Sequence, residues 1–181
     1  MKKKSHKTRN VPFRRKREGK TDYRRRLRLL LSRKPRLVIR RSLNNTIAQI
    51  VEYSDTGDKV VASASTMELR KLGWKFSTGN TPAAYLTGLA LGAKAKKKGV
   101  KHAVLDLGMQ ATTKGSRIYA CLKGVVDSGM DIPHSKDILP TDDRVNGKHI
   151  VEYAKSSKQF KTSPADIANA ITEFKKKLGA M

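Results

Sequence analysis

Residues 36–65 read RLVIRRSLNNTIAQIVEYSDTGDKVVASAS, and this stretch decides the fold. It predicts three short strands, 36–41, 46–53 and 60–65, because runs rich in β-branched residues are separated by polar turns. The dipeptide Asn44-Asn45 suits the first tight turn, since asparagine tolerates a left-handed backbone. The second turn reads Asp-Thr-Gly-Asp. We therefore expect an antiparallel three-stranded meander.

The residues that follow predict a helix and then a further strand. Residues 82–98 form a helical stretch that ends in lysines and a glycine, and 100–107 read as a buried strand. A helix between a meander and another strand implies a crossover connection, so the sheet should be mixed. Gly88 and Gly92 lie one turn apart, which would let the helix approach the sheet closely. A second helix is predicted over 116–127.

We expect three parts along the chain: a basic N-terminal arm with a first helix (1–35), an α/β RNA-binding core (36–133) and a loop with a helical C-terminal extension (134–181). Up to about residue 20 the arm is predicted to be disordered in the free protein. Two amphipathic helices flank the core, and each has an apolar stripe expected to pack on another surface. The stripe residues are Tyr23, Leu27, Leu30 and Leu31 in the first helix, and Ile167, Ile171, Phe174 and Leu178 in the last.

The net charge of the chain indicates the chemical class of its partner. The chain has 181 residues, 40 Lys and Arg against 15 Asp and Glu, and a net charge of +25. Such a charge repels itself in a compact fold, and nucleic acid is the commonest partner that relieves it. The single cysteine, Cys121, excludes an internal disulfide framework or cysteine zinc site. The sequence has no secretory leader and no apolar run long enough for a membrane span, so we expect a cytoplasmic protein without a membrane partner.

Candidate RNA-binding residues fall in three regions: the arm and first helix, the end of the first strand with its turn, and a basic loop before the second predicted helix. Lys and Arg neutralise phosphates, aromatic rings stack on unpaired bases, and a helix N-terminus favours phosphate. For Tyr23 packing competes with stacking, and for Ser116 simple helix capping competes with phosphate binding. The candidates are Lys2, Lys3, Lys4, Lys7, Arg9, Phe13, Arg14, Arg15, Lys16, Arg17, Tyr23, Arg24, Arg25, Arg28, Arg40, Arg41, Ser42, Asn44, Asn45, Lys114, Gly115, Ser116 and Arg117.

Two other functions are weighed against RNA binding. Asp106, with Glu52 and Asp55, could form the carboxylate cluster of a metal-dependent nuclease, although no paired carboxylate motif is visible and Asp106 could simply cap the next turn. The four histidines lack ligand spacing, so neither a metal nor a cofactor is expected. A chromatin-like DNA-binding protein would share the charge, but no recognition helix stands out. We expect no catalytic residues.

Several stretches, in order, resemble the L-eighteen family of large-subunit ribosomal proteins. Residues 36–42 with 47–50 are similar to the first hairpin of that family, and 80–88 to its long helix. The stretches 104–108 and 115–118 are similar to its later strand, loop and helix. Residues 131–135, 139–140 and 143–150 look like the archaeal and eukaryotic branch. The resemblance spans about residues 9–154, and eukaryotic members carry a longer C-terminal extension.

The resemblance implies a structural role without catalysis. It implies binding to 5S rRNA in the central protuberance of the large ribosomal subunit, beside large-subunit rRNA and neighbouring ribosomal proteins. It also implies a mixed sheet between helices with a ribonuclease-H-like motif. RNA contacts would come from the basic N-terminus, from Arg40 to Asn44 and from the loop 115–117. Physical reasoning from charge and helix ends selects the same regions. It predicts a rigid core that presents a basic sheet edge and loop to folded RNA.

Overall fold

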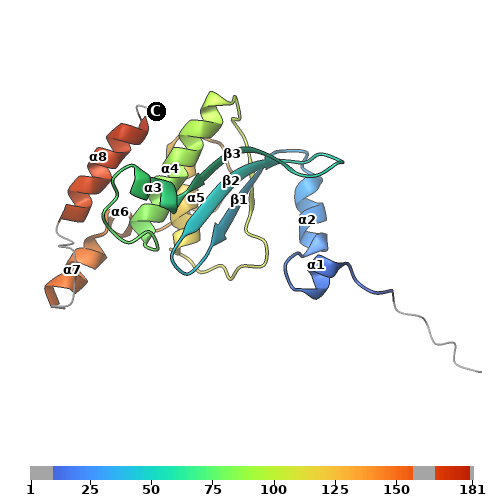
Figure 1. Cartoon of the computed structure of the whole chain (residues 1–181), viewed down its shortest axis with the longest axis horizontal. Helices are drawn as coiled ribbons and strands as arrows, with labels where there is room; N and C mark the ends of the chain where they lie inside the picture. The colour runs from blue at the N-terminus through green and yellow to red at the C-terminus, as the bar shows by residue number, and fades with distance from the viewer. Residues whose placement is uncertain (1–9, 157–165, 180–181) are drawn as a thin grey trace, which may run out of the picture.

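A four-stranded mixed sheet forms the centre of the protein (Figure 1). The computed structural model describes residues 10–156 and 166–179. The strands are β1 (Arg36–Arg41), β2 (Thr46–Glu52), β3 (Lys59–Ser65) and β4 (Val104–Asp106), and their order is β3-β2-β1-β4. The first three are antiparallel neighbours, and β4 pairs in parallel with β1. The meander and the mixed sheet predicted from the sequence are confirmed.

Side chains of β1 alternate between a buried and an open face of the sheet. Leu37 and Ile39 are fully buried, and they lie opposite Ile50 and Ala48 of β2. Because successive side chains in a strand point to opposite faces, Arg36, Val38 and Arg40 share the other face. The polar–apolar alternation of this strand therefore places arginines on one side and the hydrophobic core on the other.

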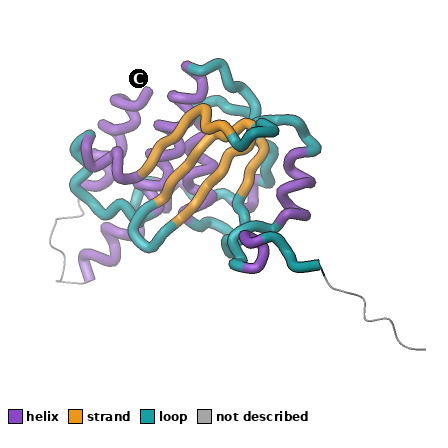
Figure 2. The backbone as a smooth tube through the Cα atoms, turned by 45° about the vertical axis from the view of Figure 1, so that its right-hand side comes forward, coloured by secondary structure: helices purple, strands orange, loops and turns teal. Residues whose placement is uncertain are grey.

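Two helices, α4 (Thr81–Lys97) and α5 (Arg117–Asp127), pack together on the buried face (Figures 1 and 2). The side chain of Asn80 accepts a hydrogen bond from the backbone N–H of Ala83, which caps the start of α4. Pro82 follows in the first turn, where its missing N–H does no harm. Helix α4 therefore begins one residue earlier than expected.

The glycines of α4 allow close contact with α5 and not with the sheet. A Cβ added at Gly88 would lie 2.1 Å from the carbonyl oxygen of Cys121, and one at Gly92 would lie 1.8 Å from Oγ of Ser128. Gly124 of α5 meets α4 in the same way, because its Cβ would lie 2.2 Å from the carbonyl oxygen of Tyr85. The expectation that Gly88 and Gly92 serve helix–sheet packing was wrong. Both helices contribute glycines, so their backbones approach each other.

The fourth strand is shorter than the predicted 100–107. Only three residue pairs join β4 to β1, and residue 102 makes an isolated bridge to Asp131. The strand stops because a carboxylate oxygen of Asp106 accepts from the N–H of Gly108, whose φ of +59° turns the chain. Asp106 thus caps the turn, which was one of the two readings of this residue.

The C-terminal helix closes the other side of the core. Helix α8 (Ile167–Gly179) packs on α4, and all four residues of its predicted apolar stripe are buried. The ring of Trp74 meets that of Phe174 edge-on at 5.4 Å. Four further helical segments lie between β3 and α8. They are α3 (Thr66–Lys71), which the sequence reading did not predict, the 3₁₀ turn Lys136–Ile138, α6 (Asp142–Val145) and α7 (Lys148–Ser156).

Two N-terminal helices, α1 (Arg14–Arg17) and α2 (Tyr23–Leu30), lie at the opposite end of the molecule from α7 and α8 (Figure 1). The single turn α1 falls inside the arm that was expected to be unstructured. The side chain of Asp22 caps α2 by accepting from the N–H groups of Arg24 and Arg25. No residue of α2 is buried, and Leu27 is 61% exposed. The expectation that the leucine stripe docks on the core was wrong.

Helix α2 is instead attached to the sheet by its arginines. A guanidinium nitrogen of Arg25 donates to the carbonyl oxygen of Gly108 at 2.8 Å, and Arg26 pairs with Asp58 at 3.0 Å. These contacts direct Arg25 and Arg26 toward the open sheet face, while Leu27 stays exposed and Leu30 is half-buried. Within residues 10–156 and 166–179, none of the helices has the length and apolar character that crossing a bilayer requires.

Candidate nucleic-acid interface

A buried ion-pair network holds the open face of the sheet together. Arg36 of β1 is 4% exposed, and its two terminal nitrogens contact Asp106 of β4 at 2.8 Å and Asp58 of the β2–β3 turn at 2.6 Å. Asp58 also accepts from Arg26 of α2. The network thus joins four elements: α2, β1, the β2–β3 turn and β4. Arg36 Nε is buried and has no hydrogen-bond partner among the described residues.

A polar hollow of about 270 Å³ lies between α2 and this network. Its floor is the open face of β1 and β2, and its wall comes from the segment that joins α1 to α2. Basic side chains outnumber acidic ones by six to three, so the hollow favours an anionic partner. The charged lining residues are Arg15, Lys20, Arg25, Arg26, Arg36 and Arg40, with Asp22, Asp58 and Asp106.

Arg40 borders the hollow and is fixed by three contacts. One terminal nitrogen donates to the carbonyl oxygens of Ile39 and Asp106, each at 2.9 Å, and the other lies 3.5 Å from a carboxylate oxygen of Asp106. Gly108 leaves room for this guanidinium, because an added Cβ would come within 3.1 Å of it. β1 is an inner strand between β2 and β4. However, β4 pairs with Arg36–Val38, so Arg40 and Arg41 extend past the end of β4 and pair with β2 on one side.

The turn after β1 is held by its own polar groups. The hydroxyl of Ser42 donates to the carbonyl oxygen of Asn45 and accepts from the N–H of the same residue. The side chain of Asn45 accepts from the hydroxyl of Thr66, whereas the side chain of Asn44 is exposed and makes no hydrogen bond in the described structure. Neither asparagine is left-handed, since Arg33 is the one non-glycine residue with positive φ among those described. The physical reason is that Ser42 closes the turn without it.

Exposed Arg41 ends β1 beside this turn. Its backbone N–H donates to the side-chain oxygen of Gln110 at 3.2 Å, so the loop after β4 lies against the end of β1. Its guanidinium makes no ion pair among the described residues. Arg41 is therefore open to a partner, unlike Arg40.

The predicted basic loop reaches the same end of the sheet. A terminal nitrogen of Arg117 donates to the carbonyl oxygens of Leu43 at 3.1 Å and Gly79 at 2.7 Å. Arg117 therefore clamps the loop to the β1–β2 turn. Lys114 is exposed and makes no ion pair or side-chain hydrogen bond among the described residues, and Gly115 has a φ of +67° that begins the turn into α5. Of this loop, Arg117 contacts the β1–β2 turn directly, at Leu43.

Ser116 does not cap α5 with its side chain. It occupies the cap position, but its hydroxyl makes no hydrogen bond to the helix, and the oxygen is buried without a partner in the described structure. The expectation of side-chain capping was wrong because the hydroxyl lies inside the protein.

The arm presents the largest set of unpaired cations. The rings of Phe13 and Tyr23 lie 5.1 Å apart, so α1 packs on the start of α2. Lys20 and Arg14 hydrogen-bond to Glu18 and hold the pKa of its carboxyl below the usual value. Four exposed cations of the two helices form neither an ion pair nor a side-chain hydrogen bond in the described part of the chain: Lys16, Arg17, Arg24 and Arg28. Lys2, Lys3, Lys4, Lys7 and Arg9 lie outside the described residues.

Sequence reasoning missed the residues that hold the site in shape. Arg36, Arg26 and Gln110 were not candidates, although each joins two parts of the surface. Arg36 was detectable in principle, because it begins a strand whose alternation with Leu37 and Ile39 places it on the face opposite the hydrophobic core. Arg26 was not, since its partner lies 32 residues away.

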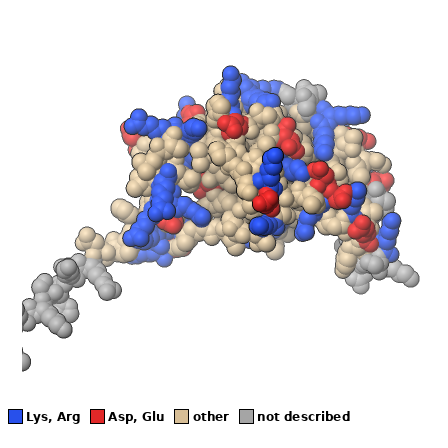
Figure 3. All heavy atoms as spheres, turned by 180° about the vertical axis from the view of Figure 1, so that it is seen from behind, with Lys and Arg blue, Asp and Glu red and all other residues tan. Residues whose placement is uncertain are grey.

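The carboxylates considered for a nuclease do not converge. Asp106 is used by Arg36 and by the turn at Gly108, and no group of three or more His, Cys, Asp or Glu that could hold a metal occurs in the part of the chain that the structure describes. Basic side chains are spread over the surface seen from behind, with acidic ones among them (Figure 3). The fold and site thus define a small basic α/β protein whose open sheet face and arginine-rich helices surround a positively charged hollow.

Comparison with known proteins identifies the family. The family model described as "Ribosomal large subunit proteins 60S L5, and 50S L18" matches residues 7–102 and 93–135, more than half of the chain. The "Large ribosomal subunit protein uL18" of Methanococcus maripaludis is 52% identical over 182 residues, which cover 93% of this chain and 94% of that relative. The chain belongs to this family of large-subunit ribosomal proteins, and it is a ribosomal protein, not an enzyme. The family resemblance seen in the sequence is confirmed.

Proposed function

We propose that the chain binds 5S rRNA and helps to anchor it in the central protuberance of the large ribosomal subunit. Large-subunit rRNA and neighbouring ribosomal proteins would complete its surroundings. The family membership supports a structural ribosomal role. The net charge of +25 supports a polyanionic partner.

One observation carries the assignment of the surface. Regions far apart in sequence meet beside β1: Arg25 of α2 bonds to Gly108, Gln110 bonds to the end of β1, and Arg117 bonds to the β1–β2 turn. A single RNA molecule could contact all of them at once. Because these contacts fix the loops before RNA arrives, little ordering of the core is required on binding.

The site residues fall into two groups: those that are free to contact RNA and those that hold the protein's own loops in place. Lys16, Arg17, Arg24, Arg28, Arg41 and Lys114 are exposed and unpaired in the described structure, so we assign them phosphate contacts. Asn44 has a free amide suited to sugar or base edges. Arg40 and Arg117 hold backbone carbonyls and act mainly by positioning the loops. The lysines within residues 1–9 would add unspecific affinity.

We further infer a ribonuclease-H-like motif and a division into arm, core and C-terminal extension at about residues 35 and 133. The order β3-β2-β1-β4, with a parallel fourth strand and helices on the buried face, supports the motif. A change from arginine-rich helices to the sheet at Pro35 supports the first boundary.

The test is competition for the purified full chain. Labelled 5S rRNA is bound at near-physiological salt and challenged with transfer RNA and with duplex DNA of similar length. We expect 5S rRNA to be retained selectively. Equal displacement by transfer RNA and DNA would refute the proposal and would instead indicate a generic basic nucleic-acid-binding protein.

A further inference from the structure

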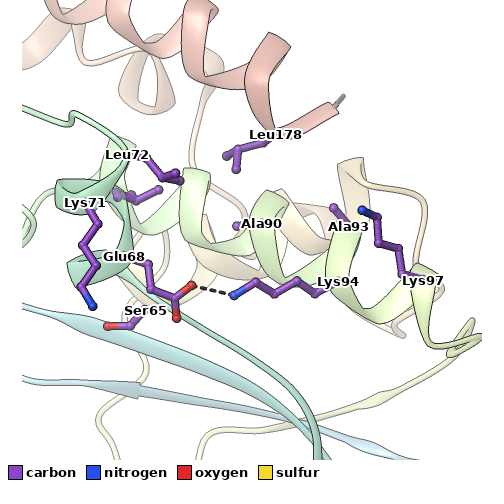
Figure 4. Close-up of a pocket in the computed structure, with 10 residues that line it drawn as sticks. Ser65, Glu68, Lys71, Leu72, Ala90, Ala93, Lys94, Lys97 and Leu178 are labelled. Carbon is purple, nitrogen blue, oxygen red and sulfur yellow. Dashed lines mark hydrogen bonds and ion pairs between the residues drawn. The ribbon is translucent and has the colours of Figure 1, made fainter. Parts of the chain in front are cut away.

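A second surface, far from the arginine-rich helices, has a different chemistry. An apolar groove of about 380 Å³ runs between α3, α4 and α8 (Figure 4). Ala90 and Ala93, one turn apart on α4, form its base, while Leu72 beyond α3 and Leu178 of α8 form its walls. Leu72 is 41% exposed. Because the alanines are small, the groove remains open where larger side chains would have filled it.

Lysines line the rim of this groove. Lys94 is paired with Glu68 at 2.6 Å and also donates to a backbone carbonyl of β3 (Figure 4). Lys71 and Lys97 form no ion pair among the described residues. The groove therefore combines an apolar floor with two unneutralised positive charges, and Glu68 is the one acidic residue that lines it.

We propose that this groove binds an acidic amphipathic helix of a neighbouring protein in the large subunit. A helix lays one apolar face into a groove of this kind, and its flanking charges pair with the rim. Carboxylates on either side of the apolar stripe would complement Lys71 and Lys97. This inference extends the proposed function by naming a protein surface, and it does not depend on which RNA the chain binds.

The groove fits RNA poorly. Phosphate contacts need cations that point at the floor of a site, whereas this floor is apolar and the cations stand at the rim. No arginine lines the groove, in contrast to the hollow beside β1. A second copy of the chain is also a poor match, because two molecules of +25 repel each other.

Photo-crosslinking in assembled large subunits tests the proposal. Leu72 is replaced by p-benzoyl-phenylalanine in the full chain, and the crosslinked peptide is identified by mass spectrometry. We expect a protein segment in which apolar residues recur at helical spacing between Asp and Glu. Met67 provides the matched control, because it lies on α3, is 57% exposed and does not line the groove.

Charge-reversal variants test whether the rim lysines contribute to binding in addition to the apolar floor. Lys71→Glu with Lys97→Glu should lower the crosslink yield about tenfold, since each lost pair weakens binding by a factor of a few. Lys101→Glu with Lys136→Glu, two exposed lysines outside the groove, should leave the yield unchanged. Emission of Trp74, the single tryptophan, verifies the fold in each variant.

Several results would overturn the proposal. They are crosslinks from position 72 to rRNA alone, to a second copy of the chain or to a protein segment without acidic residues, and a yield no higher than at Met67. Competition for 5S rRNA is measured on the same variants, so a failure of the proposed RNA binding is seen separately.

Discussion

The guanidinium of Arg36 and the carboxylate of Asp106 lie 2.8 Å apart, and each side chain is at least nine-tenths buried. They join β1 to β4, the one parallel pair of the sheet. Two charges withdrawn from water stabilise a fold only when both remain paired and hydrogen-bonded. This pair therefore makes the open face of the sheet rigid. It also engages the Asp106 carboxylate, which a metal site would have needed.

Asp106→Ala should destabilise the protein by about 3–5 kcal/mol, because it leaves the buried Arg36 short of one partner and removes the cap of the Gly108 turn. The free energy of unfolding is measured by urea denaturation. Asp58→Ala is the matched control. Its side chain is 26% exposed, so the loss should be smaller. Equal losses would show that burial does not govern this network.

Removing residues 1–20 should weaken RNA binding and flatten its salt dependence while leaving the thermal midpoint nearly unchanged. The segment contains ten Lys and Arg against one acidic residue, and none of residues 10–20 is buried. The slope of log affinity against log salt should fall by about 0.7–0.9 for each phosphate contact that is lost. An unchanged slope would mean that the arm makes no phosphate contact.

Arg24→Ala with Arg28→Ala should lower 5S rRNA affinity, because both side chains are exposed and form no ion pair in the described structure. The salt slope should fall by about 1.4–1.8 if each contacts one phosphate. Lys101→Ala with Lys136→Ala removes the same charge elsewhere and should have little effect. Filter binding over a salt series measures both variants, and equal losses would reduce the role of α2 to general charge.

Gly88→Ala should destabilise the protein although alanine is the better helix former. Helix propensity favours the change by about 1 kcal/mol, but the new Cβ would lie 2.1 Å from the carbonyl oxygen of Cys121. Separating α4 from α5 should outweigh that gain and give a net loss of about 1–3 kcal/mol. Gly99→Ala is the comparison, because the space there is open and the loss reflects only its positive φ of 78°. Calorimetry decides between them, and a stabilised Gly88→Ala would refute the close helix contact.

Cys121 should resist alkylation in the folded protein. Burial raises the pKa of this thiol to about 12, so at pH 8 it stays protonated, and the reactive thiolate is scarce as well as shielded. Iodoacetamide labelling followed by mass spectrometry should give slow modification of the native chain and rapid modification in urea. At both pH 7 and pH 9 the native chain should be labelled far more slowly than the unfolded chain, because the pKa of the buried thiol lies above both values. Equal native and unfolded rates would contradict a closed core.

The apolar stripes of α2 and α8 have similar helical spacing but different surroundings in the structure. Periodicity located the apolar stripe of α8 correctly. The stripe residues recur at helical spacing, and all four are buried in the core: Ile167, Ile171, Phe174 and Leu178. The same argument failed for α2. Its leucines have the spacing of a docked helix, yet Arg25 and Arg26 reach Gly108 and Asp58 and attach the opposite side. Periodicity identifies a helix face but not the surface available to receive it.

The candidate site shows the same division. Charge and motif selected three basic regions, and the structure links them along β1 through the bonds of Arg25 to Gly108 and of Arg117 to Leu43. Whether an arginine is free or occupied did not follow from its type. Arg40 and Arg41 are neighbours, but alternation along the strand turns the first toward Asp106 and leaves the second exposed. The clamp formed by Arg117 depends on carbonyl groups 74 and 38 residues away.

The sequence by itself determined the strands, the main helices, the excess of positive charge and the family, because these depend on local spacing and composition. The tertiary structure alone decided which arginines are buried in the network of Arg36, which glycines bring α4 and α5 together, and where the lysine-rimmed groove lies. Those features depend on contacts between residues far apart in the chain. Such contacts form only when the hydrophobic core fixes the relative positions of its elements.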